Sequence, residues 1–427
     1  NMAQGILTIN AGSSSIKFAL FPLTHPISPE AEVSGQIDGI GTNATKLVAK
    51  NHAGERIADQ LIAGERVSHS VALDAMLQWF LAAYTGWEIV AVGHRVVHGG
   101  ERYSKPIVVD ATVLGHLESF IPLAPLHEPH NVAGIQALQS LLPGVPQIAC
   151  FDTAFHRSQP EVAQLFGLPR ALTAEGIKRY GFHGLSYEYI ARTLPQHSHR
   201  ADGRVVVAHL GNGASMAAMV NRKCVGTTLG FSTIDGLMMG TRCGNLDPGV
   251  VLHLMETKGL SVKDMTRILY KESGLLGVSG ISQDMRTLLG SDKPEAHEAV
   301  NLFCYRLARR RSRRHRRAGV HRRHRRTRRR GPSPRLPAVG MAGYPRQSGS
   351  QCTPRCGHQC RQQYGRRAGH PDQRGMDDGA PRTDAARPLK KYFPVSAPAP
   401  KGAGALFFRA FLPHANGTSK RCRIYCI

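Results

Sequence analysis

The chain has 427 residues, 41% of them hydrophobic, which is enough for two or three domains with buried cores. No apolar run approaches the roughly 18 residues that span a bilayer, and the first residues lack the basic and apolar regions of a secretory signal. The chain has nine cysteines, an odd number, and they are widely scattered, which fits reduced thiols better than a disulfide framework. We therefore expect a cytosolic protein with no membrane contact.

The formal net charge of +25 would normally indicate nucleic-acid binding. The charge is not spread along the chain, however. Residues 1–305 contain 24 Lys and Arg against 26 Asp and Glu, a net charge of −2, whereas residues 306–427 contain 31 against 4, a net charge of +27. Two unlike polypeptides are therefore joined in this chain.

The first stretch with strand character is interrupted by a small polar turn. Apolar residues at 6–9 and alternating apolar residues at 16–20 predict two strands, with Gly12 to Ser14 as the turn of a hairpin. Backbone N–H groups, small hydroxyls and Lys17 would suit an anion such as phosphate. The stretch is not a P-loop, because its lysine follows the serines inside a β pattern. A polar turn without a ligand explains it equally well.

Later segments alternate between strand and helix patterns. Strands are expected at Glu32–Ile37, Ile89–Val97 and Val145–Phe151, and apolar residues at helical spacing predict a helix at Val71–Ala83. Such alternation is typical of an α/β architecture.

The opening pattern returns at residues 205–220, where a strand, the turn Gly211–Ser215 and another strand follow one another. Two similar hairpins predict two similar domains that face each other across a cleft, with a nucleotide's phosphates held between the turns. The pair favours an ATP-handling protein.

Four further segments concentrate the cations, imidazoles and carboxylates that phosphoryl transfer requires. They are Gly93–Gly100, Phe151–His156, Tyr180–Gly184 and Gly240–Pro248. Their arginines lie at strand ends or beside glycines, where a guanidinium can reach a carboxylate or phosphate. Taken singly, either arginine is better explained by a surface salt bridge, and His183 by a hydrogen-bonded position in the core.

In order along the chain, these segments resemble the acetate kinase family from Gly5 to about Ala308. Further matching pieces are Asn10–Ser15, Leu123–His127, His209–Gly213 and Ser279–Arg286. The family belongs to the superfamily of acetate and sugar kinases, heat-shock chaperone ATPases and actin. The resemblance implies an α/β fold of duplicated ribonuclease-H-like (actin-like ATPase) domains around a central cleft. The expected parts are a first domain at 1–155, the start of a nucleotide-binding domain at 156–308, and a disordered Arg-rich segment at 309–427.

The resemblance also implies a reaction and a set of site residues. The reaction is the reversible, in-line transfer of the γ-phosphoryl group of ATP to acetate, with Mg²⁺ as cofactor and a homodimer as the assembly. By position, the implied catalytic residues are Asp152 as acid/base, with His183 and Arg242 as transition-state stabilisers. The implied substrate-binding residues are Arg95, Val97, Leu126 and Phe182; the ATP contacts are Lys17, His209, Leu210, Gly211, Asn212, Gly213, Asp284, Met285 and Arg286; and the metal-placing residue is Asn10.

Two positions near the site depart from the family's usual pattern. Thr233 replaces a proline that lines the acyl pocket, so propionate is an alternative substrate, because one methylene separates substrates by only about 1–3 kcal/mol. Glu128 follows His127 where members commonly have asparagine.

From about Arg309 the family pattern stops, and no glutamate occurs from residue 306 onward. The Gly-rich adenosine-contacting turn and the glutamate that completes the family's Mg²⁺ site are lost with it. One hypothesis is a basic arm that binds nucleic acid nonspecifically. The favoured hypothesis is an out-of-register reading of the gene, because Ala codons rich in G and C become Arg codons after a one-base slip. It predicts little or no kinase activity from the chain as written.

Overall fold

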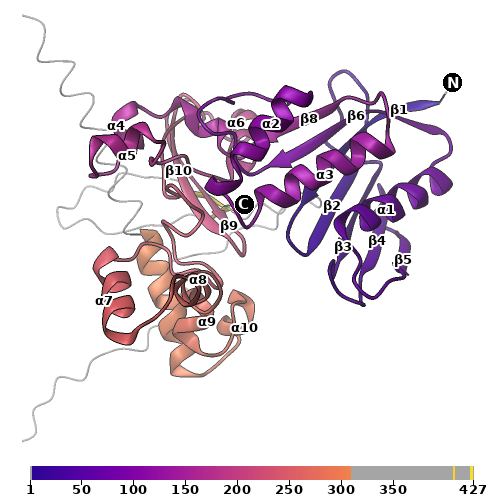
Figure 1. Cartoon of the computed structure of the whole chain (residues 1–427). Helices are drawn as coiled ribbons and strands as arrows, with labels where there is room; N and C mark the ends of the chain where they lie inside the picture. The colour runs from indigo at the N-terminus through magenta and orange to yellow at the C-terminus, as the bar shows by residue number, and fades with distance from the viewer. Residues whose placement is uncertain (1, 309–406, 409–423, 427) are drawn as a thin grey trace, which may run out of the picture.

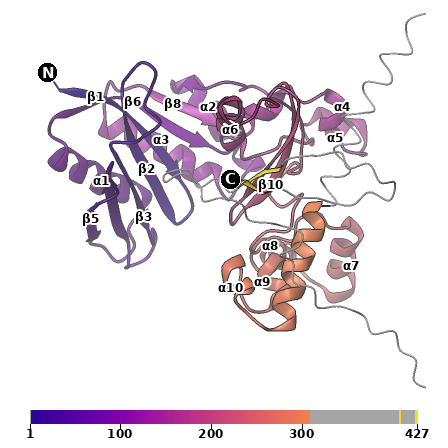
Figure 2. The same ribbon diagram turned by 180° about the vertical axis from the view of Figure 1, so that it is seen from behind.

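The protein is built from two β-sheets and a group of helices, seen from two sides in Figures 1 and 2. The computed structural model describes residues 2–308, 407–408 and 424–426. The first sheet lies at the end that carries the N-terminus, and the second lies beside it. Helices α7 to α10 gather next to the second sheet, away from the first (Figure 1).

The first sheet has eight strands in the order β5-β4-β3-β2-β1-β6-β8-β7. Strand β1 pairs antiparallel with β2 and parallel with β6, which in turn is parallel to β8. The strands are β1 (Ala3–Ala11), β2 (Ser15–Pro22), β3 (Val33–Asp38), β4 (Lys46–Asn51), β5 (Arg56–Leu61), β6 (Trp87–Val96), β7 (Ile107–Val108) and β8 (Gln147–Phe151). The carboxyl ends of the parallel strands β1, β6 and β8 therefore share one edge, where the site is built.

The expected first hairpin is present. In β1, Leu7, Ile9 and Ala11 alternate into the core. The Gly12 N–H then donates to the Ser15 carbonyl over 2.8 Å and closes the turn between β1 and β2. The register pairs Asn10 with Lys17, so both residues lie next to the turn.

Helices α1 (His69–Ala83), α2 (Ala111–Ser119) and α3 (Glu128–Leu141) accompany the first sheet, with the short 3-10 helix η1 (Ile121–Leu123) between the last two. The Ser68 side chain accepts from the Val71 N–H and caps α1, and Asp110 caps α2 in the same way. Both α1 and α2 contact α3, which also packs on β1, β6 and β8.

The second sheet has the strand order β11-β10-β9-β13-β12, which corresponds to the part β3-β2-β1-β6-β8 of the first sheet. Three consecutive antiparallel strands, β9 (Arg204–Leu210), β10 (Ala214–Val220) and β11 (Lys223–Thr227), correspond to β1, β2 and β3. Strand β13 (Ile424–Cys426) lies parallel to β9, as β6 lies parallel to β1, and pairs with β12 (Phe407–Phe408). The expected repeat of the hairpin is therefore present.

Strands β12 and β13 come from the segment at 309–427, which was expected to be disordered. In strand order they lie next to β9, at the positions that β6 and β8 have next to β1 in the first sheet. The rest of the predicted 309–427 segment lies outside the described residues.

Helix α6 (Gly184–His197) covers one face of the second sheet through Tyr187, Ala191 and Leu194. On the other face, Val206, Ala208 and Met216 pack with Val97 and Phe182 in one buried cluster. The end of β6 is thereby joined to the second sheet. Shorter elements between the sheets are η2 (Ala154–Ser158), α4 (Glu161–Gln164) and α5 (Arg170–Ala174).

The helical group contains α7 (Pro248–Lys258), α8 (Val262–Lys271), α9 (Gly274–Ser279), α10 (Met285–Leu289) and a helix at 294–308. Ser261 and Asp264 form a reciprocal capping box at the start of α8. Within the part of the chain that the structure describes, no helix is long and apolar enough to cross a membrane.

Candidate active site

Arg95 links two strand ends and the residue that follows a third. It lies near the end of β6. Its Nη2 and Nε donate over 2.6 and 3.1 Å to Oδ2 of Asp152, which is the residue directly after β8. Its Nη1 donates to Asn10 Oδ1 over 3.0 Å at the end of β1. Three residues that the sequence analysis assigned separately to substrate, catalysis and metal therefore form one connected group.

Asp152 is almost completely buried, with 2% of its surface exposed. Burial raises the pKa of its carboxyl, but the charge and hydrogen bonds of Arg95 outweigh burial, so the pKa lies below its usual value. The carboxylate is thus ionised at neutral pH and can accept hydrogen bonds. Its main-chain carbonyl accepts from the Gly184 N–H over 2.8 Å, which fixes the start of α6 against the end of β8.

His183 stands immediately before α6 with a left-handed backbone conformation, φ 60°. Non-glycine residues in this region are uncommon and are concentrated at functional sites. Its Nδ1 lies 2.8 Å from Ser215 Oγ, and its ring stacks on His209 with the centroids 4.3 Å apart. Burial, and then the neighbouring His209, lower the pKa of His183 to about 3, so the imidazole is neutral at pH 7.

The tip of the second hairpin lies against His183 and Arg242. A Cβ atom at Gly213 would lie 3.3 Å from His183 Nε2 and 3.9 Å from Arg242 Nη1. The Gly240 N–H donates to the Asn212 carbonyl over 3.2 Å and ties the tip to the loop that carries Arg242. The hairpin can therefore present its backbone N–H groups close to both side chains.

Arg242 is held by its surroundings without a carboxylate partner in the described residues. Its Nη1 donates to the Thr233 carbonyl over 3.2 Å, and its guanidinium carbon lies 5.8 Å from the centre of the Tyr270 ring. Burial lowers the pKa of Arg242, but an arginine stays protonated at neutral pH. It is a half-buried cation with N–H groups left to bind an anion.

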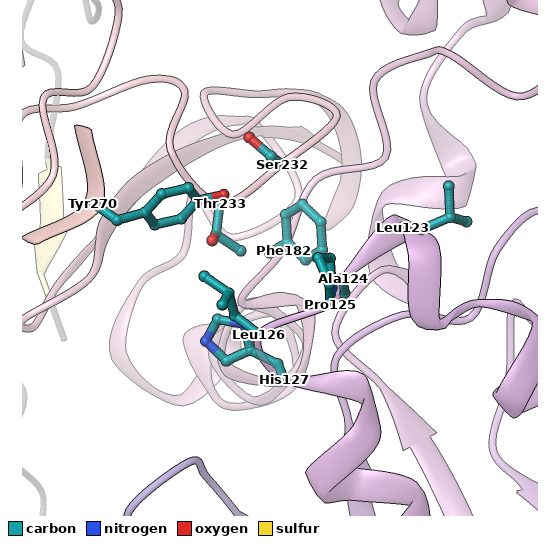
Figure 3. A pocket seen from close by; sticks show the side chains of 9 residues that line it. All are labelled: Leu123, Ala124, Pro125, Leu126, His127, Phe182, Ser232, Thr233 and Tyr270. Atoms are coloured by element: carbon teal, nitrogen blue, oxygen red, sulfur yellow. The ribbon is translucent and has the colours of Figure 1, made fainter. Parts of the chain in front are cut away.

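A small pocket opens beside these groups (Figure 3). Leu126 and Phe182, which are expected to bind substrate, and Thr233, which is expected in the acyl pocket, all line it, together with His127 and Tyr270. Val97, which is also expected to bind substrate, does not line this pocket but is buried with Phe182 in the cluster that joins the end of β6 to the second sheet. Charges of Arg242, Arg95 and Asp152 act on His127, which places the pocket next to the charged group.

The expected nucleotide contacts lie in three places. Lys17 is exposed on β2 beside the first hairpin turn. His209, Leu210, Gly211, Asn212 and Gly213 form the end of β9 and the second hairpin turn, where the His209 Nδ1 lies 3.0 Å from Ser186 Oγ.

The third place is the start of α10. A Cβ atom at Gly240 would lie 3.4 Å from the carbonyl of Gln283, the residue before Asp284. Because Gly240 is itself bonded to Asn212, the start of α10 is close to the second hairpin. Asp284 caps α10 and pairs with Arg286 over 2.9 Å on the surface. The Met285 side chain packs against the buried cluster of the helical group.

Several contacts were not evident from sequence. Ser215 contacts both His183 and the Tyr187 hydroxyl, and its only signal was its place in the second hairpin. Tyr270 lies on α8, between the Gly240–Pro248 and Ser279–Arg286 segments, and nothing in the sequence marked it as a pocket residue.

The described residues include no cluster of three or more His, Cys, Asp or Glu side chains arranged to hold a metal ion. Oxygen donors are nevertheless present where the two strand ends meet, on Asn10 and Asp152 around Arg95. Such a sparse set fits a Mg²⁺ ion that takes most of its ligands from nucleotide phosphates and water.

Comparisons with known proteins agree with this geometry. The model of the Acetokinase family matches residues 5–315. The acetate kinase of Rhodopseudomonas palustris is 52% identical over 311 residues, covering 72% of this chain and 78% of that protein. Two crystal structures are 36% identical: a propionate kinase from Francisella tularensis (TM-score 0.66; 72% of this chain, 78% of that one) and the Porphyromonas gingivalis acetate kinase (TM-score 0.63; 71% and 77%). On these grounds, the chain belongs to the acetokinase family of phosphotransferases with the actin-like ATPase fold.

Proposed function

We propose that this site transfers the γ-phosphoryl group of ATP to acetate, reversibly, giving acetyl phosphate and ADP. The observation that carries the proposal is the convergence of Arg95, Arg242 and a neutral His183 from different parts of the chain. The charges of Asp152, Arg95 and Arg242 all act on His183, so the groups share one site. The transferred group in such reactions spreads negative charge over its equatorial oxygens, which fixed cations and hydrogen-bond donors stabilise.

Each residue has a distinct part in this proposal. Arg95 binds the acetate carboxylate, and Asp152 holds the guanidinium of Arg95 in place. Acetate is already ionised at neutral pH, so its attack on phosphorus requires no proton removal, and these contacts support an orienting role for Asp152. Arg242 and His183 donate to the transferring group, while the Gly211–Gly213 turn supplies backbone N–H groups to the nucleotide phosphates.

The methyl group of acetate would enter the pocket formed by Leu126, Phe182 and Thr233. With acetate bound, the side chains of Leu126 and Phe182 would keep water from the reacting carboxylate. We infer that Mg²⁺ accompanies ATP, with Asn10 as the protein residue that helps to place it. When bound, the ion neutralises nucleotide phosphate charge.

The experiment is to incubate the chain with ATP, Mg²⁺ and acetate and to trap acetyl phosphate as its hydroxamate. Two forms are compared: the 427-residue chain, and a chain whose reading frame after about Ala308 is restored. We expect strong product formation from the restored chain and little from the other, since residues after 315 lie outside the family match. No hydroxamate from either form would overturn the proposed function. Strong activity from the 427-residue chain, with a verified gene, would overturn the frameshift hypothesis alone.

Propionate is the second candidate substrate. Thr233 lines the pocket at the position where the family commonly has proline. The similar structure from F. tularensis is described as a propionate kinase.

Three further expectations stay predictions: a homodimer, a cytosolic location, and nonspecific nucleic-acid binding by the Arg-rich segment, most of which lies outside the described residues. Light scattering would test the first. A DNA-binding assay across salt concentrations, with and without residues 309–427, would test the last.

A further inference from the structure

The first turn of α3 holds the ends of two strands that carry site residues. Glu128 Oε2 accepts from the His98 main-chain N–H over 3.1 Å, and Asn131 Oδ1 accepts from the adjacent Val97 N–H over 2.9 Å. The Asn131 Nδ2 donates to the Ala11 carbonyl over 2.9 Å. Residues three apart on a helix lie on one face, so a single turn of α3 reaches both β6 and β1.

These contacts lie next to the substrate-binding group. Val97 and His98 follow Arg95 by two and three residues, and Ala11 follows Asn10. The Val97 and His98 N–H groups lie just past the end of β6 at Val96, where strand pairing no longer satisfies them. Glu128 and Asn131 therefore supply the hydrogen bonds that continue the ordered backbone beyond Arg95.

Glu128 is an unusual residue for this task, because it is fully buried, with 0% of its surface exposed, and its Oε1 has no hydrogen-bond partner. No cation forms an ion pair with it in the described residues. The titratable and charged groups around it are His127, the residue just before α3, His98 after β6, and Asp152 after β8. The charge of Arg157 in η2 and the ring of Tyr180 act on or contact His98. The ionised carboxylate of Asp152 would repel a negative charge on Glu128.

We propose that Glu128 and Asn131 are positioning residues that fix the backbone after Arg95, and that Glu128 performs this role as a neutral carboxylic acid. A neutral acid keeps the carbonyl oxygen that accepts from His98 but avoids an unpaired buried charge. In agreement, burial raises the pKa of Glu128 to about 8. The inference rests on the proposed function only in its link to acetate binding.

Two measurements that need no turnover test it on the 427-residue chain. In the first, infrared difference spectra between the wild type and Glu128→Gln should show a protonated carboxyl stretch at pH 7 that disappears by about pH 10. In the second, hydrogen exchange of the His98 amide should quicken roughly tenfold in Glu128→Ala, the equivalent of one lost hydrogen bond, and slow again in Glu128→Gln. Glu118→Gln, at an exposed carboxyl on α2, is the matched control and should change neither result.

The link to the reaction is tested in the register-restored chain. Glu128→Ala should raise the KM for acetate about tenfold with the KM for ATP unchanged, and Glu128→Gln should restore it. An absent carboxyl band at pH 7 would overturn the neutral state of Glu128, and equal His98 exchange in the Ala and Gln variants would overturn its positioning role. An inactive wild type would instead count against the proposed function, and the two spectroscopic results would stand by themselves.

Discussion

Arg95 and Asp152 lie 57 residues apart in sequence, yet two nitrogens of the Arg95 guanidinium contact the same oxygen of Asp152. A third nitrogen reaches Asn10, so the guanidinium plane is fixed from two sides. An arginine held in this way loses little conformational entropy when it binds a carboxylate. Preorganisation of Arg95 is therefore the part we assign to Asp152.

Replacing Asp152 by asparagine should free Arg95 while keeping the side-chain shape. Removing one partner of a buried charge pair costs about 3–5 kcal/mol, so the variant should be less stable and bind acetate weakly. Urea unfolding and the KM for acetate in the register-restored chain measure the two effects. An unchanged KM would show that Asp152 does not orient Arg95.

His183→Ala and Arg242→Ala should each lower kcat about 10²–10³-fold, the usual cost of removing one donor to a transition state. ATP binding should change little, because these contacts strengthen only as phosphoryl transfer proceeds. Steady-state kinetics and a nucleotide-binding titration on the restored chain separate the two quantities. Arg222→Ala, whose side chain pairs with Asp202 on the surface, is the matched control. Near-wild-type turnover in either site variant would contradict the assignment.

Glu128 should make stability fall as pH rises. Its pKa is raised in the folded state to about 8 from an ordinary value of 4.5, so the folded protein holds a proton that the unfolded chain releases. The contribution is complete below pH 4.5 and is lost as the pH rises to about 8, by up to about 1.4 kcal/mol per pH unit. Buried histidines such as His183, whose pKa is lowered, change stability in the opposite direction below about pH 6.5, so the slope is read from the difference in thermal midpoint between the 427-residue chain and Glu128→Gln from pH 4.5 to 9. The same difference should appear between Glu118→Gln and Glu128→Gln; parallel pH profiles in all three proteins would contradict the raised pKa.

Gly184→Ala should destabilise the protein, because a Cβ atom there would lie 2.1 Å from the Asp152 main-chain oxygen. Such overpacking typically costs about 1–3 kcal/mol or more. Gly115→Ala, in the exposed face of α2 with no atom within 4 Å of its Cβ, should instead stabilise by about 0.5–1 kcal/mol. Urea unfolding of both variants should give opposite signs. A neutral Gly184→Ala would mean that α6 and β8 are not in direct contact.

Thr233 should set the preference between acetate and propionate. A proline here would fill part of the pocket, and one methylene is worth about 1–3 kcal/mol, so Thr233→Pro should lower the propionate-to-acetate ratio of kcat/KM at least tenfold. Thr233→Ala enlarges the pocket and should raise that ratio. Assays of the restored chain with both acids provide the measurement, and equal ratios in all three proteins would exclude Thr233 from acyl selection.

Much of the fold could be predicted from local sequence. Alternating apolar residues and a small polar turn are signals within about 15 residues, which is why both hairpins were found and why β3, α1, β6 and β8 lie within about two residues of the expected bounds. The order of the motifs along the chain also indicated the acetate kinase family, and the match of the family model to residues 5–315 confirms it. Charge counts separated the two ends of the chain, a property that needs no coordinates.

Tertiary structure alone decided how distant side chains combine. Arg95 could have formed a surface salt bridge, but parallel pairing of β1, β6 and β8 brought its guanidinium to Asn10 and Asp152. Burial of Glu128 depends on how α3 packs against β6, which no local pattern encodes, and Tyr270 reaches the pocket only because α8 folds back beside the Arg242 loop. Local periodicity determines which residues can form an element, whereas pairing and burial between remote segments determine which side chains meet and in what charge state.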